Sequence, residues 1–294
     1  MEIKTILAPS DFSQDAERAI ETATSLAKSF GARLRLLHVV QPPVQPAGPE
    51  LAVAPVAFWR ELHDNAAKRL ALVKEKVAAA GVACDVEVID DMPGFAIADA
   101  AERSHADLIV MGSRGLTGLK HLVLGSVAER TVRYAKCPVL TVKDHGRALA
   151  FRTIVVPMDF SPGAKQALEL AKWFAKKSGP AHLVLVHAYY VPVELEQYLA
   201  EHGEATFDRI SKQVTKDLDA MLADLQSAGL SAEYVARAGS PDHVILEVVK
   251  EKRADLVAMG THGRRGLSHL LLGSVAERVV RTAEAPVLTV RERK

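Results

Sequence analysis

The chain has 294 residues, of which 49% are hydrophobic and 25% are charged, and its formal net charge at pH 7 is +1. This length fits two domains of about 150 residues, each large enough to bury about 70% of its unfolded surface without a metal or a disulfide. Residues 1–150 carry 18 basic and 18 acidic side chains and residues 151–294 carry 19 and 18, so neither half has the positive excess that nucleic-acid binding requires.

The sequence also lacks the signals of a membrane or secreted protein. No run of about 18 apolar residues could span a bilayer, and the N-terminus is not that of a signal peptide. We therefore expect a soluble cytoplasmic protein. Cys84 and Cys137 have alanines at the corresponding positions of the second half, which favours small buried side chains over the alternative of a redox pair.

Short β-branched runs alternate with segments of helical period, which predicts a parallel sheet with crossover helices in each half. The strands expected in the first half are Ile3–Pro9, Arg33–Val40, Ala83–Ile89, Leu108–Met111 and Val139–Val142. The helices expected there run from Ser13 to Phe30 and from Ala57 to Ala80, with a third after Pro93 and a fourth near Ser126.

The second half repeats this order, so that each half has five strands and four helices. The elements expected are strands at Thr153–Pro157, His182–Ala188, Glu233–Ala236, Leu256–Met259 and Val287–Val290, with helices over Ser161–Ser178, up to Ala228, after Pro241 and before the last strand. We predict one domain over 1–143, a linker over 144–150 and a second domain over 151–294. The proline-rich segment 41–57, which does not repeat, is interpreted as a surface loop or as a lid over a neighbouring site.

A glycine pattern recurs in both halves at an offset of 148 residues. Gly112, Gly115 and Gly125-Ser126 form G-x-x-G, nine residues, then G-S, and the second copy consists of Gly260, Gly263 and Gly273-Ser274. Glycines let a backbone approach a phosphate or ribose closely, and a helix N-terminus adds N–H donors and a positive dipole end. Two intact copies favour a ligand site over a tight structural turn. The pattern is neither a Walker loop nor the G-x-G-x-x-G dinucleotide motif.

The chain resembles a tandem universal stress protein, with two such domains fused. The resemblance is carried by ILAPSDFS and IVVPMDFS after the first strands, by LLHVV and VLVHAYY at the second strands, and by the G-2x-G-9x-G-S signature in both halves. It implies in each half a Rossmann-like or flavodoxin-like α/β/α sandwich with a five-stranded parallel sheet of order 3-2-1-4-5. It also implies ATP as the ligand, with Mg²⁺ held through the phosphates.

The resemblance assigns roles to residues of both halves. Asp11 and Asp159 contact the ribose or adenine, and the backbone of Val39 and Ala188 borders the adenine; a helix cap is the alternative role for the aspartates. The ribose and phosphates are assigned to Gly112, Gly115, Gly125, Ser126, Val127, Gly260, Gly263, Gly273, Ser274 and Val275. The predicted site also includes Pro9, Met111, Arg114, Pro157 and Met259.

Two positions depart from the family's usual residues, and the loops add further basic residues near the predicted sites. Ala188 stands where the family usually has valine, although a backbone contact does not depend on that side chain. Asp91-Met-Pro93 departs from the family's G-x-P, which Gly239-Ser-Pro241 keeps. The basic residues between the glycines are either phosphate contacts or solvated loop charges; they are Arg114, Lys120, His121, His262, Arg264, Arg265 and His269.

The residues favour binding over catalysis. Phosphoryl transfer needs a positioned nucleophile, a metal clamp and cationic stabilisation, whereas neither a catalytic triad nor a metal-ligand cluster repeats in both halves. We therefore predict an ATP-responsive stress or signalling module. The alternatives are a nucleotide-free scaffold that binds a protein, lipid or metabolite, and a slow ATPase. By the same resemblance, the two halves pair through their last strands as an intrachain pseudo-dimer, and further homodimerisation stays open.

Overall fold

The computed structural model describes residues 2–41, 56–115, 124–143, 151–177, 179–189, 205–263 and 272–292. The chain divides into two compact units, Met1–Ala148 and Leu149–Glu292. The predicted linker 144–150, most of the proline-rich segment and its counterpart after Tyr189 lie outside the described residues.

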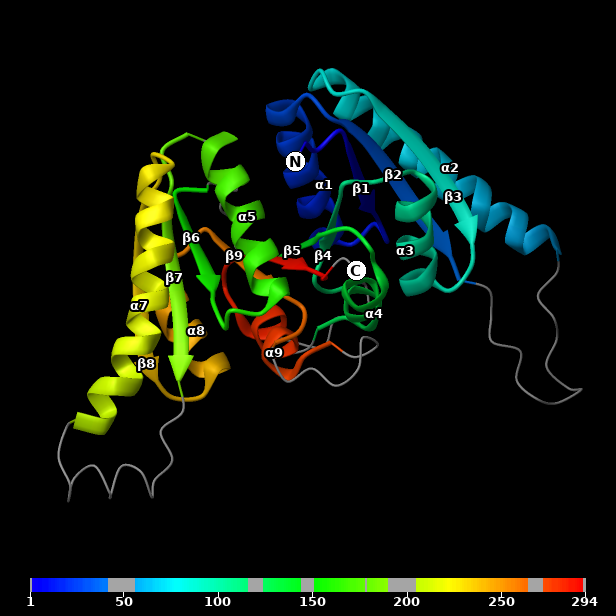
Figure 1. The fold of residues 1–294 in the computed structure, drawn as a ribbon. Helices are drawn as coiled ribbons and strands as arrows, with labels where there is room; N and C mark the ends of the chain where they lie inside the picture. The colour runs from blue at the N-terminus through cyan, green and yellow to red at the C-terminus, as the bar shows by residue number, and fades with distance from the viewer. Residues whose placement is uncertain are drawn as a thin grey trace, which may run out of the picture. The chain divides into compact units, whose positions relative to one another are not determined.

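The first unit alternates strands and helices along the chain (Figure 1). Its elements are β1 (Thr5–Pro9), α1 (Gln14–Phe30), β2 (Arg33–Val40), α2 (Val56–Ala79), β3 (Cys84–Asp90), α3 (Pro93–Arg103), β4 (Leu108–Gly112), α4 (Ser126–Tyr134) and β5 (Val139–Val142). These strands pair in parallel in the order β3-β2-β1-β4-β5. The predicted fold class and strand order are confirmed in this unit.

The second unit repeats the arrangement. Its elements are β6 (Thr153–Pro157), α5 (Pro162–Lys177), β7 (His182–Tyr189), α7 (Ala205–Ser227), β8 (Ser231–Ala238), α8 (Pro241–Glu251), β9 (Leu256–Gly260), α9 (Ser274–Thr282) and β10 (Val287–Val290). Its strands are also parallel, in the order β8-β7-β6-β9-β10. Because the two units correspond element by element, each one serves as a natural comparison for the other.

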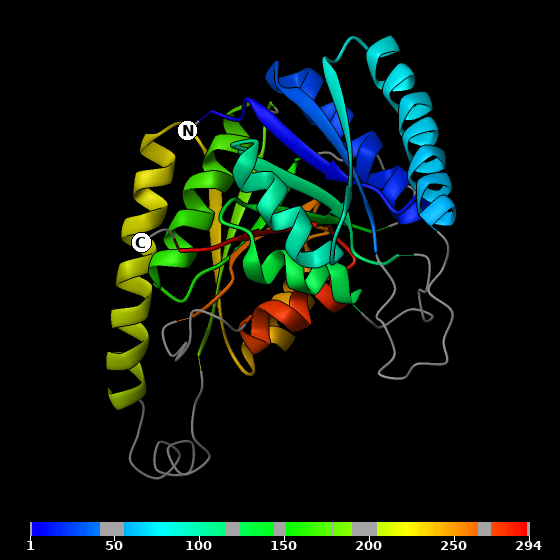
Figure 2. The ribbon, with the colours of Figure 1, turned by 90° about the vertical axis from the view of Figure 1, so that its right-hand side faces the viewer.

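Helices cover both faces of each sheet, as Figures 1 and 2 show. In the first unit α1 packs on β1 and β4 and α2 packs on β2 and β3, while α3 and α4 pack on each other. Right-handed crossovers place α1 and α2 on one face, because the chain moves outward from β1 to β3, and place α3 and α4 on the opposite face after it returns to β4. The central strands β1 and β4 are therefore buried from both sides.

The cores are built from these central strands. Ile6, Leu108 and Ile109 have no exposed surface, and neither do Ile154 and Leu256 of the second unit. Such continuous apolar runs are typical of parallel strands that are covered on both faces. Burial of these side chains, at about 25 cal/mol per Å² of apolar surface, supplies the main favourable term in folding.

One carboxylate in each unit accepts hydrogen bonds from backbone N–H groups at the start of the first strand. Asp107 Oδ2 accepts hydrogen bonds from the backbone N–H groups of Lys4 and Thr5, at 2.8 and 3.0 Å. Asp255 does the same for Arg152 and Thr153, at 3.1 and 2.9 Å. Asp107 directly precedes β4 and Asp255 directly precedes β9. These bonds therefore hold the start of β4 beside β1 and the start of β9 beside β6.

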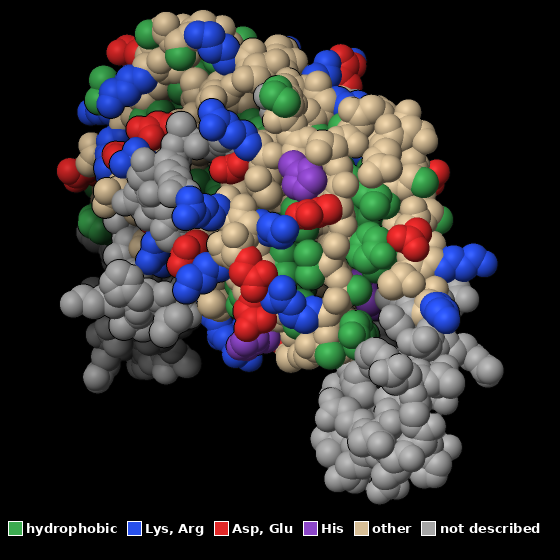
Figure 3. All heavy atoms as spheres, turned by 90° about the vertical axis from the view of Figure 1, so that its left-hand side faces the viewer, with side chains coloured by type: hydrophobic (Ala, Val, Ile, Leu, Met, Phe, Trp, Pro, Cys, Tyr) green, Lys and Arg blue, Asp and Glu red, His purple; other side chains and the backbone are tan. Residues whose placement is uncertain are grey.

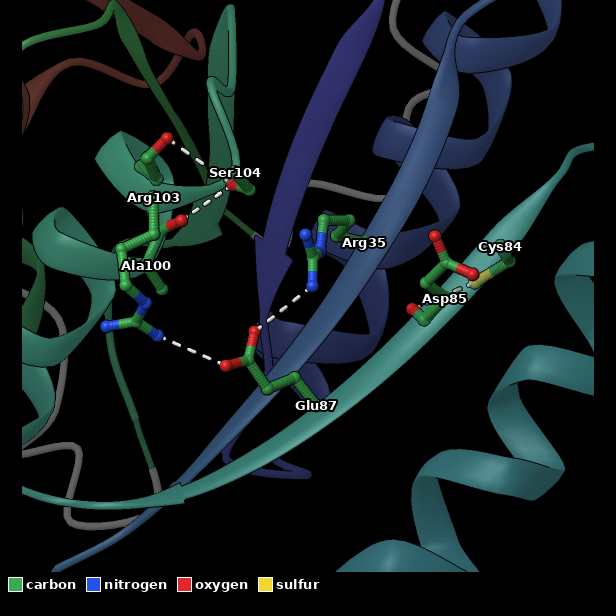
Figure 4. Close-up of polar contacts among 8 residues, drawn as sticks. Arg35, Cys84, Asp85, Glu87, Ala100, Arg103 and Ser104 are labelled. Carbon is green, nitrogen blue, oxygen red and sulfur yellow. Dashed lines mark hydrogen bonds and ion pairs between the residues drawn. The ribbon is translucent and has the colours of Figure 1, made fainter.

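Ion pairs tie the outer strands of the first unit to α3. Glu87 on β3 pairs with Arg35 on β2 at 3.4 Å and with Arg103 on α3 at 3.1 Å (Figure 4). At the start of the same strand the Cys84 thiol donates to the Asp85 carbonyl at 3.6 Å, and burial raises its pKa to about 11. Cys137 is buried as predicted, whereas Cys84 is only half-buried; with so high a pKa its thiol is unreactive at neutral pH.

The described surface carries charges of both signs. On the face drawn in Figure 3, Lys and Arg side chains are interspersed with Asp and Glu, which agrees with the near-zero net charge. Within the described residues, no helix has the length and apolar character needed to cross a membrane.

Candidate functional site

Both units have a topological switch point at the carboxyl ends of their central strands. The chain leaves β1 toward α1 on one face of the sheet, whereas the crossover between the adjacent strands β4 and β5 lies on the other face. Strands β6 and β9 repeat this geometry in the second unit. In open α/β sheets ligands bind in the crevice that such diverging connections create.

An aspartate occupies the turn after each first strand. Asp11 Oδ1 accepts a hydrogen bond from the Ser13 N–H, and Asp159 Oδ1 accepts one from Ser161, both at 3.0 Å. The helix cap is the serine, because Ser13 Oγ accepts from the Ala16 N–H at 3.2 Å. The alternative interpretation of the aspartates as helix caps is therefore wrong.

The second carboxylate oxygen of each aspartate faces the glycine loop. A Cβ placed on Gly115 would lie 2.5 Å from Asp11 Oδ2, and one on Gly263 would lie 2.7 Å from Asp159 Oδ2. Any side chain at these two positions would push the carboxylate away. The structure thus brings together, in both units, the aspartate and the second glycine of the signature.

The first glycine of each signature has a packing role. A Cβ on Gly112 would lie 3.0 Å from the backbone carbon of Asp15, and a Cβ on Gly260 would lie 2.9 Å from that of Gly163. The first turn of α1 or α5 therefore lies directly against the end of the fourth strand. This contact explains the glycine without a ligand.

The third glycine closes the loop and begins the last helix. The Gly125 N–H donates to the Ser113 carbonyl and the Gly273 N–H donates to the Thr261 carbonyl, both at 2.9 Å. Each glycine is an N-cap without a side-chain hydrogen bond. The first N–H groups of α4 and α9 have no intrahelical acceptor, and together with the helix dipole they favour an anion.

The other predicted residues border the same edge of each sheet. Ser126 and Ser274 are exposed at the first positions of α4 and α9, followed by the half-buried Val127 and Val275. The remaining positions are strand ends: Pro9 and Pro157 end β1 and β6, Met111 and Met259 are buried near the ends of β4 and β9, and Val39 and Ala188 are the next-to-last residues of β2 and β7.

The two units differ at the residue before the second glycine. Arg114 Nε pairs with Asp15 Oδ2 at 3.1 Å, and both side chains are largely buried. The second unit has Gly163 at the position of Asp15, and His262 replaces the arginine, with Nδ1 2.9 Å from Thr261 Oγ1. Arg114 is therefore held against the protein by this ion pair and is not a solvated loop charge. The other five basic residues of these loops lie outside the described residues.

The histidines of the second strands have a structural role. His38 Nδ1 is 2.7 Å from the Ser10 carbonyl oxygen, and His187 Nδ1 is 2.6 Å from that of Met158. Each ring also packs on the phenylalanine after the aspartate, with centroids 4.6 Å apart for Phe12 and 5.2 Å for Phe160. Both phenylalanines have a φ of 63°, a left-handed conformation that costs a bulky residue about 1–3 kcal/mol.

Comparison with known proteins agrees with this geometry. The sequence model of the Universal stress protein family matches the chain twice, over residues 2–143 and 150–291. The chain belongs to the universal stress protein family. Its two matches make it a tandem member.

Individual relatives span one or both domains. A universal stress protein of Methanocaldococcus jannaschii is 35% identical over 144 residues, which is 48% of this chain and 82% of that protein. One from Mycolicibacterium smegmatis is 28% identical over 306 residues, or 98% of this chain and 97% of the relative. The crystal structure of a universal stress protein from Archaeoglobus fulgidus has a TM-score of 0.78 and 26% identity, and the match covers all of both chains.

Sequence reasoning missed two parts of this region. The Asp15–Arg114 pair was not predicted, because Asp15 has no acidic counterpart in the second half. Phe12 and Phe160 were not predicted either, although their repetition at the offset of 148 residues could have identified them.

Proposed function

We propose that each domain binds ATP, with Mg²⁺ held through the phosphates, and that the protein is a nucleotide-responsive stress or signalling module. The observation that carries this proposal is the approach of Asp11 to Gly115 and of Asp159 to Gly263 at the switch points. In both units the absence of a Cβ lets a carboxylate lie directly against the glycine loop. A carboxylate suits the hydroxyls of a ribose as a hydrogen-bond acceptor.

The donor set beside this carboxylate fits a polyphosphate. The N-cap residue of α4 makes no side-chain hydrogen bond, so the first turn offers the backbone N–H groups of Ser126 and Val127, and the exposed Ser126 hydroxyl adds a further donor. Ser274 and Val275 repeat this arrangement on α9. Helix N-termini of this kind bind phosphates through N–H donors and the dipole. Among the described residues, no group of three His, Cys, Asp or Glu side chains could hold a metal, so Mg²⁺ would be bound through ATP.

The same residues give little support for fast hydrolysis. Within the described part of each site, the carboxylate that faces the second glycine is Asp11 or Asp159, and one of its oxygens is engaged by the turn. In the first site the Asp15 carboxylate also lies at the loop, but it pairs with Arg114. Positioning a water and stabilising the transferring phosphoryl group need further groups. We therefore favour a binding role over slow ATP hydrolysis. Because both copies of the signature are intact, we also favour it over a nucleotide-free scaffold.

Calorimetric titration with Mg–ATP tests the proposal. We expect two sites in the natural chain and one site in each of the variants Gly115→Val and Gly263→Val, because the new side chain displaces the aspartate of one domain. The double variant should bind none, with unchanged circular dichroism as the control for folding. Retention of both sites in the double variant, or no binding by the natural chain at millimolar ATP, would contradict the proposal and favour the scaffold.

A further inference from the structure

An arginine of α2 lies at the edge of the first candidate site without taking part in the predicted signature. The guanidinium carbon of Arg69 is 3.8 Å from the centroid of the Phe12 ring, and the same ring contacts the His38 ring, with centroids 4.6 Å apart. Arg69 is exposed. Among the described residues, its N–H groups make no hydrogen bond or ion pair.

Phe12 fixes the place of this cation. Phe12 directly follows Asp11, whose Oδ2 faces Gly115, so the guanidinium is held beside the turn that supplies the carboxylate. A guanidinium held over an aromatic ring keeps its N–H donors available and loses little further entropy when it binds an anion. Arg69 therefore presents a preorganised positive charge at the rim of the site.

The second domain reverses this charge. Leu70 and Leu218 are both fully buried, and Gly81 and Gly229 both have a positive φ after the helix. This alignment of α2 with α7 puts Asp217 at the position of Arg69, and Asp217 is exposed as well. The phenylalanine–histidine contact is kept in the second domain, and by this alignment the charge at the corresponding position of α7 has the opposite sign.

We infer that Arg69 strengthens, and Asp217 weakens, the binding of an anionic nucleotide, so that the first site has the higher affinity. This inference rests on the proposed function. Charges at a protein surface interact weakly but measurably even without direct contact. Since Mg–ATP carries more than one negative charge, reversing the sign of the rim charge should change its dissociation constant by about tenfold.

The test measures each site alone in the full chain. With the second site closed by Gly263→Val, Mg–ATP is titrated into the natural first site and into the variants Arg69→Lys and Arg69→Asp, at about 0.05 and 0.5 M salt. We expect Arg69→Asp to weaken binding about tenfold at low salt and Arg69→Lys to stay within about threefold. The difference should shrink at high salt, because the screening length falls well below 10 Å. With the first site closed by Gly115→Val, Asp217→Arg should strengthen binding by a similar factor.

Lys76→Asp is the matched control. Lys76 is an exposed cation on the same helix, about 10 Å further from the site at 1.5 Å per residue, and its reversal should change affinity by less than twofold. Equal affinities in Arg69→Asp and the natural site would overturn the inference. So would a loss in Arg69→Lys as large as in Arg69→Asp at both salt concentrations, since that result would assign Arg69 to the stack on Phe12 alone. Absence of binding in the natural chain would instead reject the proposed function.

Discussion

The glycines of the signature have different neighbours, so substitutions at single positions should affect either the stability of the domain or the binding of ATP. Gly112 faces the backbone of α1, which cannot move without the helix, whereas Gly115 faces the end of the Asp11 side chain. We predict that Gly112→Ala destabilises the first domain by about 1–3 kcal/mol through backbone displacement. Gly115→Ala should leave stability almost unchanged and weaken ATP binding. Denaturant unfolding and ATP titration of the two variants measure both effects; a large loss of stability in Gly115→Ala would show that our account of its neighbour is wrong.

Asp11 and Asp159 give a second prediction at this scale. Asparagine keeps the Oδ1 acceptor for the turn, but it can present an amide donor where Asp11 has Oδ2. If that oxygen accepts from a ribose hydroxyl, Asp11→Asn should weaken ATP binding in the first domain by about tenfold, the value of a hydrogen bond to a charged group. An affinity equal to that of the natural chain would show that Asp11 Oδ2 does not bind the nucleotide. Titration of Asp11→Asn in a chain with Gly263→Val isolates the effect.

At the scale of elements, the contact between the last two helices differs between the domains. Asp242 on α8 pairs with Arg278 Nε on α9 at 2.9 Å and accepts from the Ser240 hydroxyl, whereas the first domain has Gly94 packed against the Arg130 stem. The Ser240 hydrogen bond, followed by the Arg278 charge, lowers the pKa of Asp242. A lowered pKa in the folded state means that the ionised form stabilises the domain above about pH 4 and that this contribution is lost as the pH falls below that value.

The resulting prediction concerns Asp242→Asn. Unfolding of the second domain should become easier at pH 7 by about 2 kcal/mol, because a charged hydrogen-bonded acceptor is lost. The difference from the natural chain should shrink as the pH falls below about 4, because Asp242 becomes protonated in the unfolded and then in the folded chain. Urea unfolding between pH 2 and pH 7 measures it. A difference that is constant across this range would contradict the ion pair.

Much of this element-scale arrangement was predictable from sequence, and the exceptions have physical causes. Apolar central strands such as Leu108–Gly112 and the serine and glycine helix ends were found because burial and capping leave direct patterns. β8 was predicted as Glu233–Ala236 but spans Ser231–Ala238, because this outer strand is half-exposed and carries polar residues that break the apolar run. Side-chain pairs between distant elements, such as Asp15–Arg114, leave no periodic signal in a sequence.

At the scale of the whole molecule, the tandem repeat raises the question of how the domains pair. Pairing through Cys137–Val142 and Ala285–Val290 stays a prediction. If these edge strands pair within one chain, the amides of β5 and β10 that do not bond to β4 or β9 should exchange with solvent as slowly as those that do. Their protection should not depend on protein concentration. Fast exchange at those amides, or protection that appears only at high concentration, would exclude the intrachain pseudo-dimer.

The most direct test of the central claim is a crystal structure of the protein grown with Mg–ATP. Our account predicts nucleotide at both switch points, with the ribose at Asp11 and Asp159 and the phosphates at the N-termini of α4 and α9. Nucleotide bound elsewhere, or crystals that hold none at millimolar Mg–ATP, would contradict it.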